Sequence, residues 1–140
     1  MFTRKGSAKW QGGLKDGKAS VSTQSGALKD QPYGFNTRFE DKPGTNPEEL
    51  IGAAHASCFS MALSLMLEEA GISNVAIETT SAITLEKQGD GFAITKAHLT
   101  TKVSGDGDKA TIEDLTQKAK AGCPVSKLMN AEITIDATVA

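Results

Sequence analysis

Two cysteines, Cys58 and Cys123, are the residues of this sequence best suited to redox chemistry. A deprotonated thiol is a strong nucleophile, and its sulfur can be oxidised reversibly. Cys58 lies in the segment NPEELIGAAHASCF, three residues after His55. On a helix these two side chains would be neighbours one turn apart. The histidine is therefore a possible partner of the thiol, although buried helical histidines more often serve as hydrogen-bonded structural residues.

Both cysteines also have a structural interpretation. The neighbours of Cys58 on a helix would be small and aliphatic, which suits a cysteine that acts as a small core hydrophobe. Cys123, in AGCPVSKL, precedes a proline that suits the first position of a helix. Cys123 would then be the N-cap residue, where unpaired backbone N–H groups and the helix dipole favour an anion. A cysteine that merely happens to precede a helix is the alternative.

Arg38 and Glu48 are the charged residues that would assist a reactive thiol. GFNTRFE is predicted to be a strand in which Arg38 shares a face with Asn36 and Glu40. A guanidinium near Cys58 would stabilise the thiolate and could hold a peroxide or alkoxide oxygen. The alternative for Arg38 is a surface ion pair with Glu40. Glu48 would orient Arg38, or would simply be an acidic residue favoured in the first turn of a helix.

The sequence predicts neither a metal nor a cofactor. No other cysteine or histidine has metal-ligand spacing near either thiol, so a zinc site is not expected. The segment GDGDKA matches a degenerate dinucleotide-binding pattern, but its two aspartates would repel a pyrophosphate. The same segment lacks residues that a calcium loop requires, and it is predicted to be a solvated turn.

Charge and composition indicate a cytoplasmic protein that binds neither nucleic acid nor membrane. Fifteen basic and seventeen acidic residues are interspersed and give a net charge of −2. The N-terminus lacks the apolar run of a signal peptide, and in a reducing compartment the cysteines should be thiols at rest. Residues 50–67 carry no charge and approach the length of a membrane span, but their polar residues and acidic flanks favour a helix buried within a protein.

The predicted elements form one domain, residues 1–140, of the α+β class. The N-terminal β region, 1–45, holds strands at SAKW and KASVSTQS, a turn at Asp16-Gly17, and a third strand over 33–40. A central helix over 46–70 is bounded by Asn46 and Gly71. The C-terminal αβ region, 75–140, contains a hairpin, two helices and a last strand, which favours an antiparallel sheet.

The central helix is apolar on nearly every side, so nearly every side must be covered. One small sheet cannot enclose it. The pattern therefore predicts a homodimer in which sheets from both chains wrap paired helices.

Three segments, PYGFNTRFE, GTNPEELIGAAHASCFSMALSLML and KAKAGCPVSK, together resemble the OsmC/Ohr family of thiol-dependent peroxidases. The resemblance covers essentially the whole chain. It implies an intertwined homodimer in which antiparallel sheets wrap central helices. It also implies a peroxidatic Cys58, a resolving Cys123, and assisting roles for Arg38 and Glu48, without a cofactor.

The resemblance further implies a reaction. Cys58 would reduce a hydroperoxide to an alcohol and become a sulfenic acid, and Cys123 would convert this acid into a disulfide. An external dithiol, of the lipoyl type in one branch of the family, would restore both thiols. The apolar surroundings of Cys58 favour organic hydroperoxides over hydrogen peroxide, in defence against oxidative or osmotic stress. Two alternatives are a stress-induced dimer that binds an apolar ligand without catalysis, and a thiol redox sensor.

The spacing along the helix adds a prediction about the dimer. Glu48 and Cys58 are ten residues apart, which is about 15 Å along a straight helix. That distance is too long for a shared hydrogen-bond network. We therefore expect Glu48, and with it Arg38, to act on the partner's Cys58.

Overall fold

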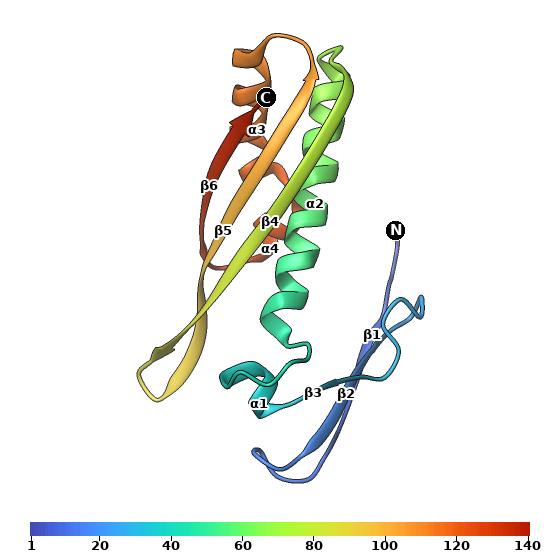
Figure 1. The fold of residues 1–140 in the computed structure, drawn as a ribbon, viewed down its shortest axis with the longest axis vertical. Coiled ribbons are helices and arrows are strands. Elements are labelled where there is room, and N and C mark those ends of the chain that lie inside the picture. The colour runs from blue at the N-terminus through green and yellow to red at the C-terminus, as the bar shows by residue number, and fades with distance from the viewer. The chain divides into compact units, whose positions relative to one another are not determined.

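The computed structural model describes residues 1–140, which form two compact units, Met1–Leu50 and Ile51–Ala140. Figure 1 shows the strands and helices of both. The boundary between the units falls inside helix α2 (Pro47–Glu69). The prediction of one domain over residues 1–140 therefore stays a prediction.

The N-terminal unit contains a three-stranded antiparallel sheet of β1 (Gly6–Gln11), β2 (Lys18–Thr23) and β3 (Gln31–Tyr33). The predicted strands at SAKW and KASVSTQS are confirmed. The predicted hairpin between these strands is formed, but a two-residue turn at Asp16-Gly17 is wrong, because the loop spans residues 12–17 and its positive φ of 104° falls at Gly12. Asp16 instead closes the loop by accepting a hydrogen bond from the Gly13 N–H at 3.0 Å.

The strand predicted over 33–40 is wrong. The chain leaves the sheet after β3 and forms a short helix, α1 (Phe35–Phe39). The Thr37 hydroxyl closes this turn: it accepts from the Gly34 N–H at 2.9 Å and donates to the Gly34 carbonyl at 3.0 Å. Phe35 and Phe39 stack at 5.0 Å on the same side. Aromatic residues four apart suit a helix face as well as a strand face, so their spacing did not distinguish the two.

Helix α2 confirms the predicted central helix and both of its boundaries. The Asn46 side-chain oxygen accepts a hydrogen bond from the Glu49 N–H at 2.9 Å, which satisfies one free donor of the first turn. At the other end Gly71 takes a φ of 77°. The Gly71 and Ile72 N–H groups donate to the Glu68 and Leu67 carbonyls, both at 2.9 Å. This is the double hydrogen bond with which glycine commonly ends a helix.

The C-terminal unit is a sheet of three strands with helices α2, α3 and α4. The long strands β4 (Ser73–Gln88) and β5 (Gly91–Asp106) form the predicted antiparallel hairpin. Helices α3 (Lys109–Gly122) and α4 (Pro124–Leu128) then return the chain to β6 (Glu132–Val139). The α+β class is confirmed. However, β6 pairs with β5 in parallel, because the helical connection brings the chain back to the end from which β5 started.

The core of this unit lies between the sheet and the helices. Helix α2 runs beside the β4–β5 hairpin (Figure 1) and buries one stripe of side chains against it. The stripe consists of Gly52, His55, Phe59, Leu63 and Leu67, at the three- and four-residue spacing of one helix face. Strand β5 adds Leu99 and Val103 to this core, and α3 adds Ile112 and Ala119.

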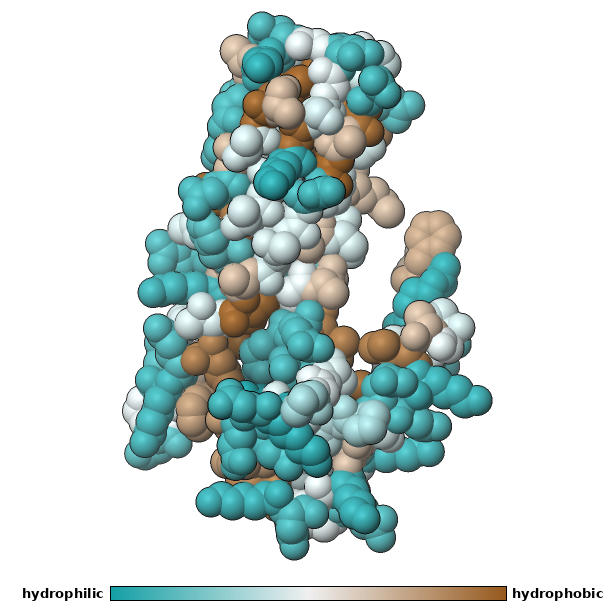
Figure 2. Space-filling model, in the orientation of Figure 1, coloured by the Kyte–Doolittle hydropathy of each residue, from teal (hydrophilic) through white to brown (hydrophobic).

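The opposite face of α2 is exposed in a single chain, although it is also apolar. Met61 is 76% exposed and Leu65 54%. Small exposed residues share this face: Ser64 lies between Met61 and Leu65, and Ala53, Ala54 and Ser57 continue the face toward the start of the helix. An 18-residue window of α2 has the hydropathy of a membrane span, with 28% of it buried, but core helices share this length and composition. On the face that Figure 2 shows, hydrophobic side chains appear as brown patches between hydrophilic ones.

Close packing of α2 on β4 generates a prediction for Gly52. A Cβ at this position would lie 2.7 Å from the Ser81 carbonyl oxygen, which is a backbone atom and cannot rotate away. Alanine favours the helix by about 1 kcal/mol. We nevertheless expect Gly52→Ala to lower the free energy of unfolding by about 1–3 kcal/mol, because the helix must move off the strand. Urea denaturation measures this change.

The matched control is Gly91→Ala, since an added Cβ there meets nothing within 4 Å. Its free energy of unfolding should stay near that of the wild type. A Gly52→Ala protein that is more stable than the wild type would contradict the packing argument.

Candidate active site

The two thiols lie together, although 65 residues separate them in the sequence. Cys58 comes from the middle of α2 and is partly buried, and Cys123 joins α3 to α4 and is fully buried. Both are free thiols, and they lie close enough for Cys123 to affect the pKa of Cys58. The sheet brings them together, because α2 and the α3–α4 segment pack into the same core.

The surroundings of Cys58 act on its charge in opposite directions. Burial raises the pKa of the Cys58 thiol, because an apolar environment disfavours the thiolate. A hydrogen bond from the Val125 backbone lowers the same pKa, and the neighbouring Cys123 raises it. The surroundings that the C-terminal unit provides therefore favour the neutral thiol form of Cys58. A reactive thiolate needs an additional positive charge or hydrogen-bond donor.

The first turn of α4 supplies a backbone donor to each sulfur. Pro124 occupies the start of the helix, as predicted, and Cys123 is its N-cap. The Ser126 N–H donates to the Cys123 sulfur at 3.4 Å, and the preceding residue, Val125, provides the backbone hydrogen bond to Cys58. Free N–H groups at the start of a helix are suited to sulfur that carries negative charge.

His55 does not pair with Cys58. It is fully buried, and each ring nitrogen meets a serine hydroxyl: Nδ1 lies 2.7 Å from Ser81 Oγ, and Nε2 lies 2.8 Å from Ser126 Oγ. Burial lowers the pKa of His55 from its ordinary value of 6.5, so the ring is neutral at pH 7. The sequence allowed two interpretations of His55, and the structure shows the second: a buried histidine held by hydrogen bonds.

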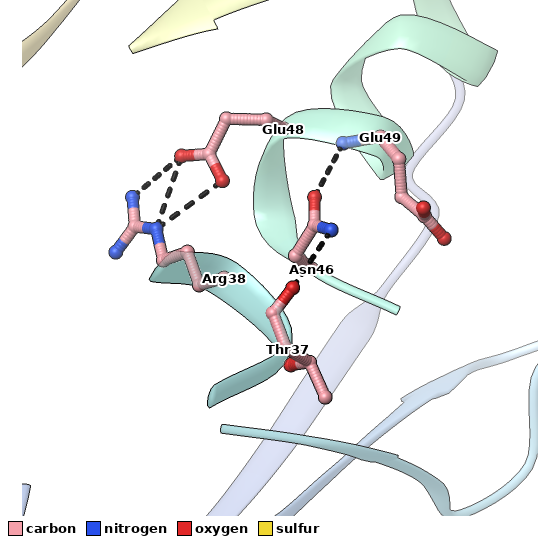
Figure 3. A network of polar contacts seen from close by, with 5 residues as sticks. All are labelled: Thr37, Arg38, Asn46, Glu48 and Glu49. Carbon is pink, nitrogen blue, oxygen red and sulfur yellow. Dashed lines mark hydrogen bonds and ion pairs between the residues drawn. The ribbon is translucent and has the colours of Figure 1, made fainter. Parts of the chain in front are cut away.

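Arg38 and Glu48 form a forked ion pair in the N-terminal unit (Figure 3). Arg38 Nη2 donates to Glu48 Oε1 at 2.7 Å, and Arg38 Nε lies 3.1 and 3.2 Å from the two carboxylate oxygens. The predicted alternative, a surface pair of Arg38 with Glu40, is not the arrangement formed. The Asn46 side-chain amide also connects the start of α2 to α1 by donating to the Thr37 carbonyl at 3.3 Å. The fork fixes the orientation of the guanidinium, and its side chain remains 35% exposed.

The structure thus forms two clusters from the residues singled out in the sequence. Cys58 and Cys123 make the first, and Arg38 and Glu48 make the second. The catalytic role of all four stays a prediction. Sequence reasoning missed Ser81, and it gave no role to Val125 or Ser126. The signal for Ser126 was its place three residues after a predicted N-cap, where a backbone N–H meets the capping side chain. No group of three or more His, Cys, Asp and Glu side chains is arranged to hold a metal ion.

The buried histidine generates a prediction about acid stability. Its pKa is lowered in the folded state, so between that value and 6.5 the unfolded chain binds a proton that the folded chain does not. The free energy of unfolding should therefore fall as the pH drops below 6.5, by up to about 1.4 kcal/mol per pH unit from this group. His55→Gln removes the titrating ring and should show a shallower decline. Urea denaturation between pH 8 and pH 5 compares the two slopes, and equal slopes would contradict the prediction.

The family profile described as OsmC-like protein matches residues 39–138 of the chain. Peroxiredoxin OsmC of Escherichia coli (strain K12) is 60% identical over 134 residues, which cover 95% of this chain and 94% of that protein. Organic hydroperoxide resistance protein OhrA of Bacillus subtilis (strain 168) is 35% identical over 99 residues, covering 69% of this chain and 67% of that protein.

A solved structure has the same fold over nearly the full length. The crystal structure of the organic hydroperoxide resistance protein OhrB of Bacillus subtilis covers 98% of both chains, with a TM-score of 0.70 and 28% identity. Together with the profile match and the identity to the Escherichia coli protein, it shows that this chain belongs to the OsmC-like family.

Proposed function

We propose that this protein is a thiol-dependent peroxidase that reduces organic hydroperoxides to alcohols, and hydrogen peroxide more weakly. The observation that carries the proposal is the pair of free thiols that lie close together at the start of α4, where the Ser126 N–H donates to the Cys123 sulfur. The names of the relatives agree, since the Escherichia coli protein is called a peroxiredoxin and the Bacillus subtilis proteins are named for resistance to organic hydroperoxides.

The proposed reaction has two steps within the protein. The Cys58 thiolate attacks the peroxide O–O bond and takes up one oxygen as a sulfenic acid, and the other oxygen leaves with a proton as an alcohol. The Cys123 thiol then attacks the sulfenic sulfur, forming a Cys58–Cys123 disulfide and releasing water. An external dithiol, proposed to be of the lipoyl type, reduces the disulfide to two thiols and is itself oxidised. No metal or cofactor takes part.

Arg38 is proposed to supply the positive charge that Cys58 lacks. Burial disfavours the Cys58 thiolate, and a guanidinium beside the sulfur would reverse this and stabilise the oxygen that leaves the peroxide. Glu48 holds the guanidinium in a fixed orientation through its two carboxylate oxygens. Because ten residues of helix separate Glu48 from Cys58, we propose that the pair acts on the partner's Cys58.

The protein is further proposed to be a homodimer. One face of α2 is apolar yet exposed, with Met61 76% and Leu65 54% accessible to solvent. A second copy of the same helix face would bury these side chains, and two-fold contacts between identical faces are the commonest way in which chains assemble. Hydroperoxide and reductant, rather than nucleic acid or membrane, are the proposed partners, and the proposed location is the cytoplasm.

Peroxide consumption tests the proposed function. With cumene hydroperoxide and excess dithiothreitol, the wild type should turn over continuously, and Cys58→Ser should show no turnover because the attacking sulfur is gone. Without dithiothreitol, Cys123→Ser should consume one equivalent and stop as a sulfenic acid, because that acid has no internal partner, whereas the wild type should stop as the disulfide. Dimedone labelling of Cys58, followed by mass spectrometry, identifies that acid.

A wild type as inert as both variants would overturn the proposal and favour the apolar-ligand alternative. A wild type that forms the disulfide once, without turnover, would favour the redox sensor.

Mixed dimers test whether Arg38 acts across the interface. Cys58→Ser and Arg38→Met protomers carry different tags and are combined, and each homodimer should be inactive. If Arg38 acts on the partner's Cys58, the mixed dimer has one complete site. Random mixing should then recover about a quarter of the wild-type activity, because half of the dimers are mixed and each has one working site of two. Recovery of no activity would place Arg38 beside the Cys58 of its own chain.

A further inference from the structure

His55 joins three elements of the C-terminal unit from a fully buried position on α2. Its Nδ1 lies 2.7 Å from the Ser81 hydroxyl on β4, and its Nε2 lies 2.8 Å from the Ser126 hydroxyl on α4. A neutral imidazole has one donor and one acceptor nitrogen, and a hydroxyl can do either, so both contacts can be satisfied together. The ring is a fixed bridge with no nitrogen left for the Cys58 proton.

Ser126, which lies at the α4 end of this bridge, also forms a hydrogen bond with a thiol. Ser126 uses its hydroxyl for His55 and its backbone N–H for the Cys123 sulfur, at 3.4 Å. The preceding residue, Val125, provides the backbone hydrogen bond to Cys58. One turn of α4 therefore carries the contacts to His55 and to both sulfurs. That helix has only five residues, too few to be rigid alone, so its position depends on what holds it.

We propose that His55 is a positioning residue of the thiol site: by holding Ser126 against α2 and β4, it keeps Cys123 in place to attack the Cys58 sulfur. The proposal rests on the proposed two-cysteine chemistry, and it assigns His55 no contact with substrate. The requirement for alignment is physical, since a disulfide needs its two sulfurs about 2.05 Å apart with a specific dihedral angle. Small misplacement of an attacking group lowers the rate of a reaction within one molecule.

The chain offers a matched control for a merely structural contact. The Ser60 hydroxyl also comes from α2 and also meets β4, by donating to Thr79 Oγ1 at 2.9 Å. Thr79 continues to Thr101 on β5, again at 2.9 Å, and this chain of hydroxyls does not include α4. Ser60→Ala therefore breaks a helix-to-strand hydrogen bond of the same kind while leaving the α4 contacts in place.

The test isolates the attack of Cys123 on Cys58 without using a peroxide. Ellman's reagent reacts with the more accessible Cys58, giving a mixed disulfide and one thionitrobenzoate. Cys123 then displaces the second thionitrobenzoate as the protein disulfide forms, at a rate that does not depend on the reagent concentration. Absorbance follows both releases. The variants are Ser126→Ala, Ser126→Thr, His55→Gln and the control Ser60→Ala, each also measured for its free energy of unfolding.

We expect the second release to slow about tenfold in Ser126→Ala, the size of effect that one lost buried hydrogen bond produces. His55→Gln should slow it as well, Ser126→Thr should recover most of the rate by restoring the hydroxyl, and Ser60→Ala should react like the wild type. Wild-type rates in both Ser126→Ala and His55→Gln would overturn the proposal. So would an equal slowing in Ser60→Ala, because loss of stability would then explain the effect.

The same variants with cumene hydroperoxide separate this inference from the proposed function. If the peroxide oxidises no variant, including the wild type, while the Ellman rates follow the expected order, the peroxidase proposal fails and the positioning role of His55 stands. If the wild type consumes peroxide normally and the Ellman rates do not differ, the peroxidase proposal stands and the role of His55 fails.

Discussion

The burial of helix α2 is the constraint on which the rest of the structure depends. Its side chains are apolar around most of its circumference, and water must be excluded from most of that surface for the helix to be stable. The sheet of β4, β5 and β6, together with α3, covers one stripe, at Phe59, Leu63 and Leu67. The opposite face, which includes Met61 and Leu65, is left for another surface to cover.

The same helix organises the chemistry because different residues of it serve different clusters. Its first turn carries Glu48, which fixes the guanidinium of Arg38. Its middle carries Cys58 on the edge of the buried stripe, where the sulfur is partly shielded and meets Cys123. His55 lies in the stripe itself and connects the helix to β4 and α4. The packing of α2 therefore also positions the residues of both clusters.

The parallel pairing of β6 with β5 explains why the second thiol reaches the first. A parallel connection must return along the length of the sheet, and α3 and α4 make that return on the face that α2 occupies. The break between the two helices falls at Cys123, so its sulfur is placed at the start of α4. Burial disfavours the thiolate of Cys58, which is why the proposed reaction calls for a positive charge beside that sulfur.

The sequence by itself determined the helix boundaries, because these depend on residues within one turn of the helix end. Asn46, Pro47 and Gly71 set the bounds of α2, since caps depend on side chains within a few residues. Pro124 likewise set the start of α4 and made Cys123 its cap. The sequence could not distinguish a helix from a strand at Phe35 and Phe39, whose spacing suits both. The partners of His55 and the direction of β6 were decided only by the tertiary structure. Ser81 and Ser126 lie 26 and 71 residues from His55, and only the packing of β4 and α4 onto one helix brings their hydroxyls to its ring.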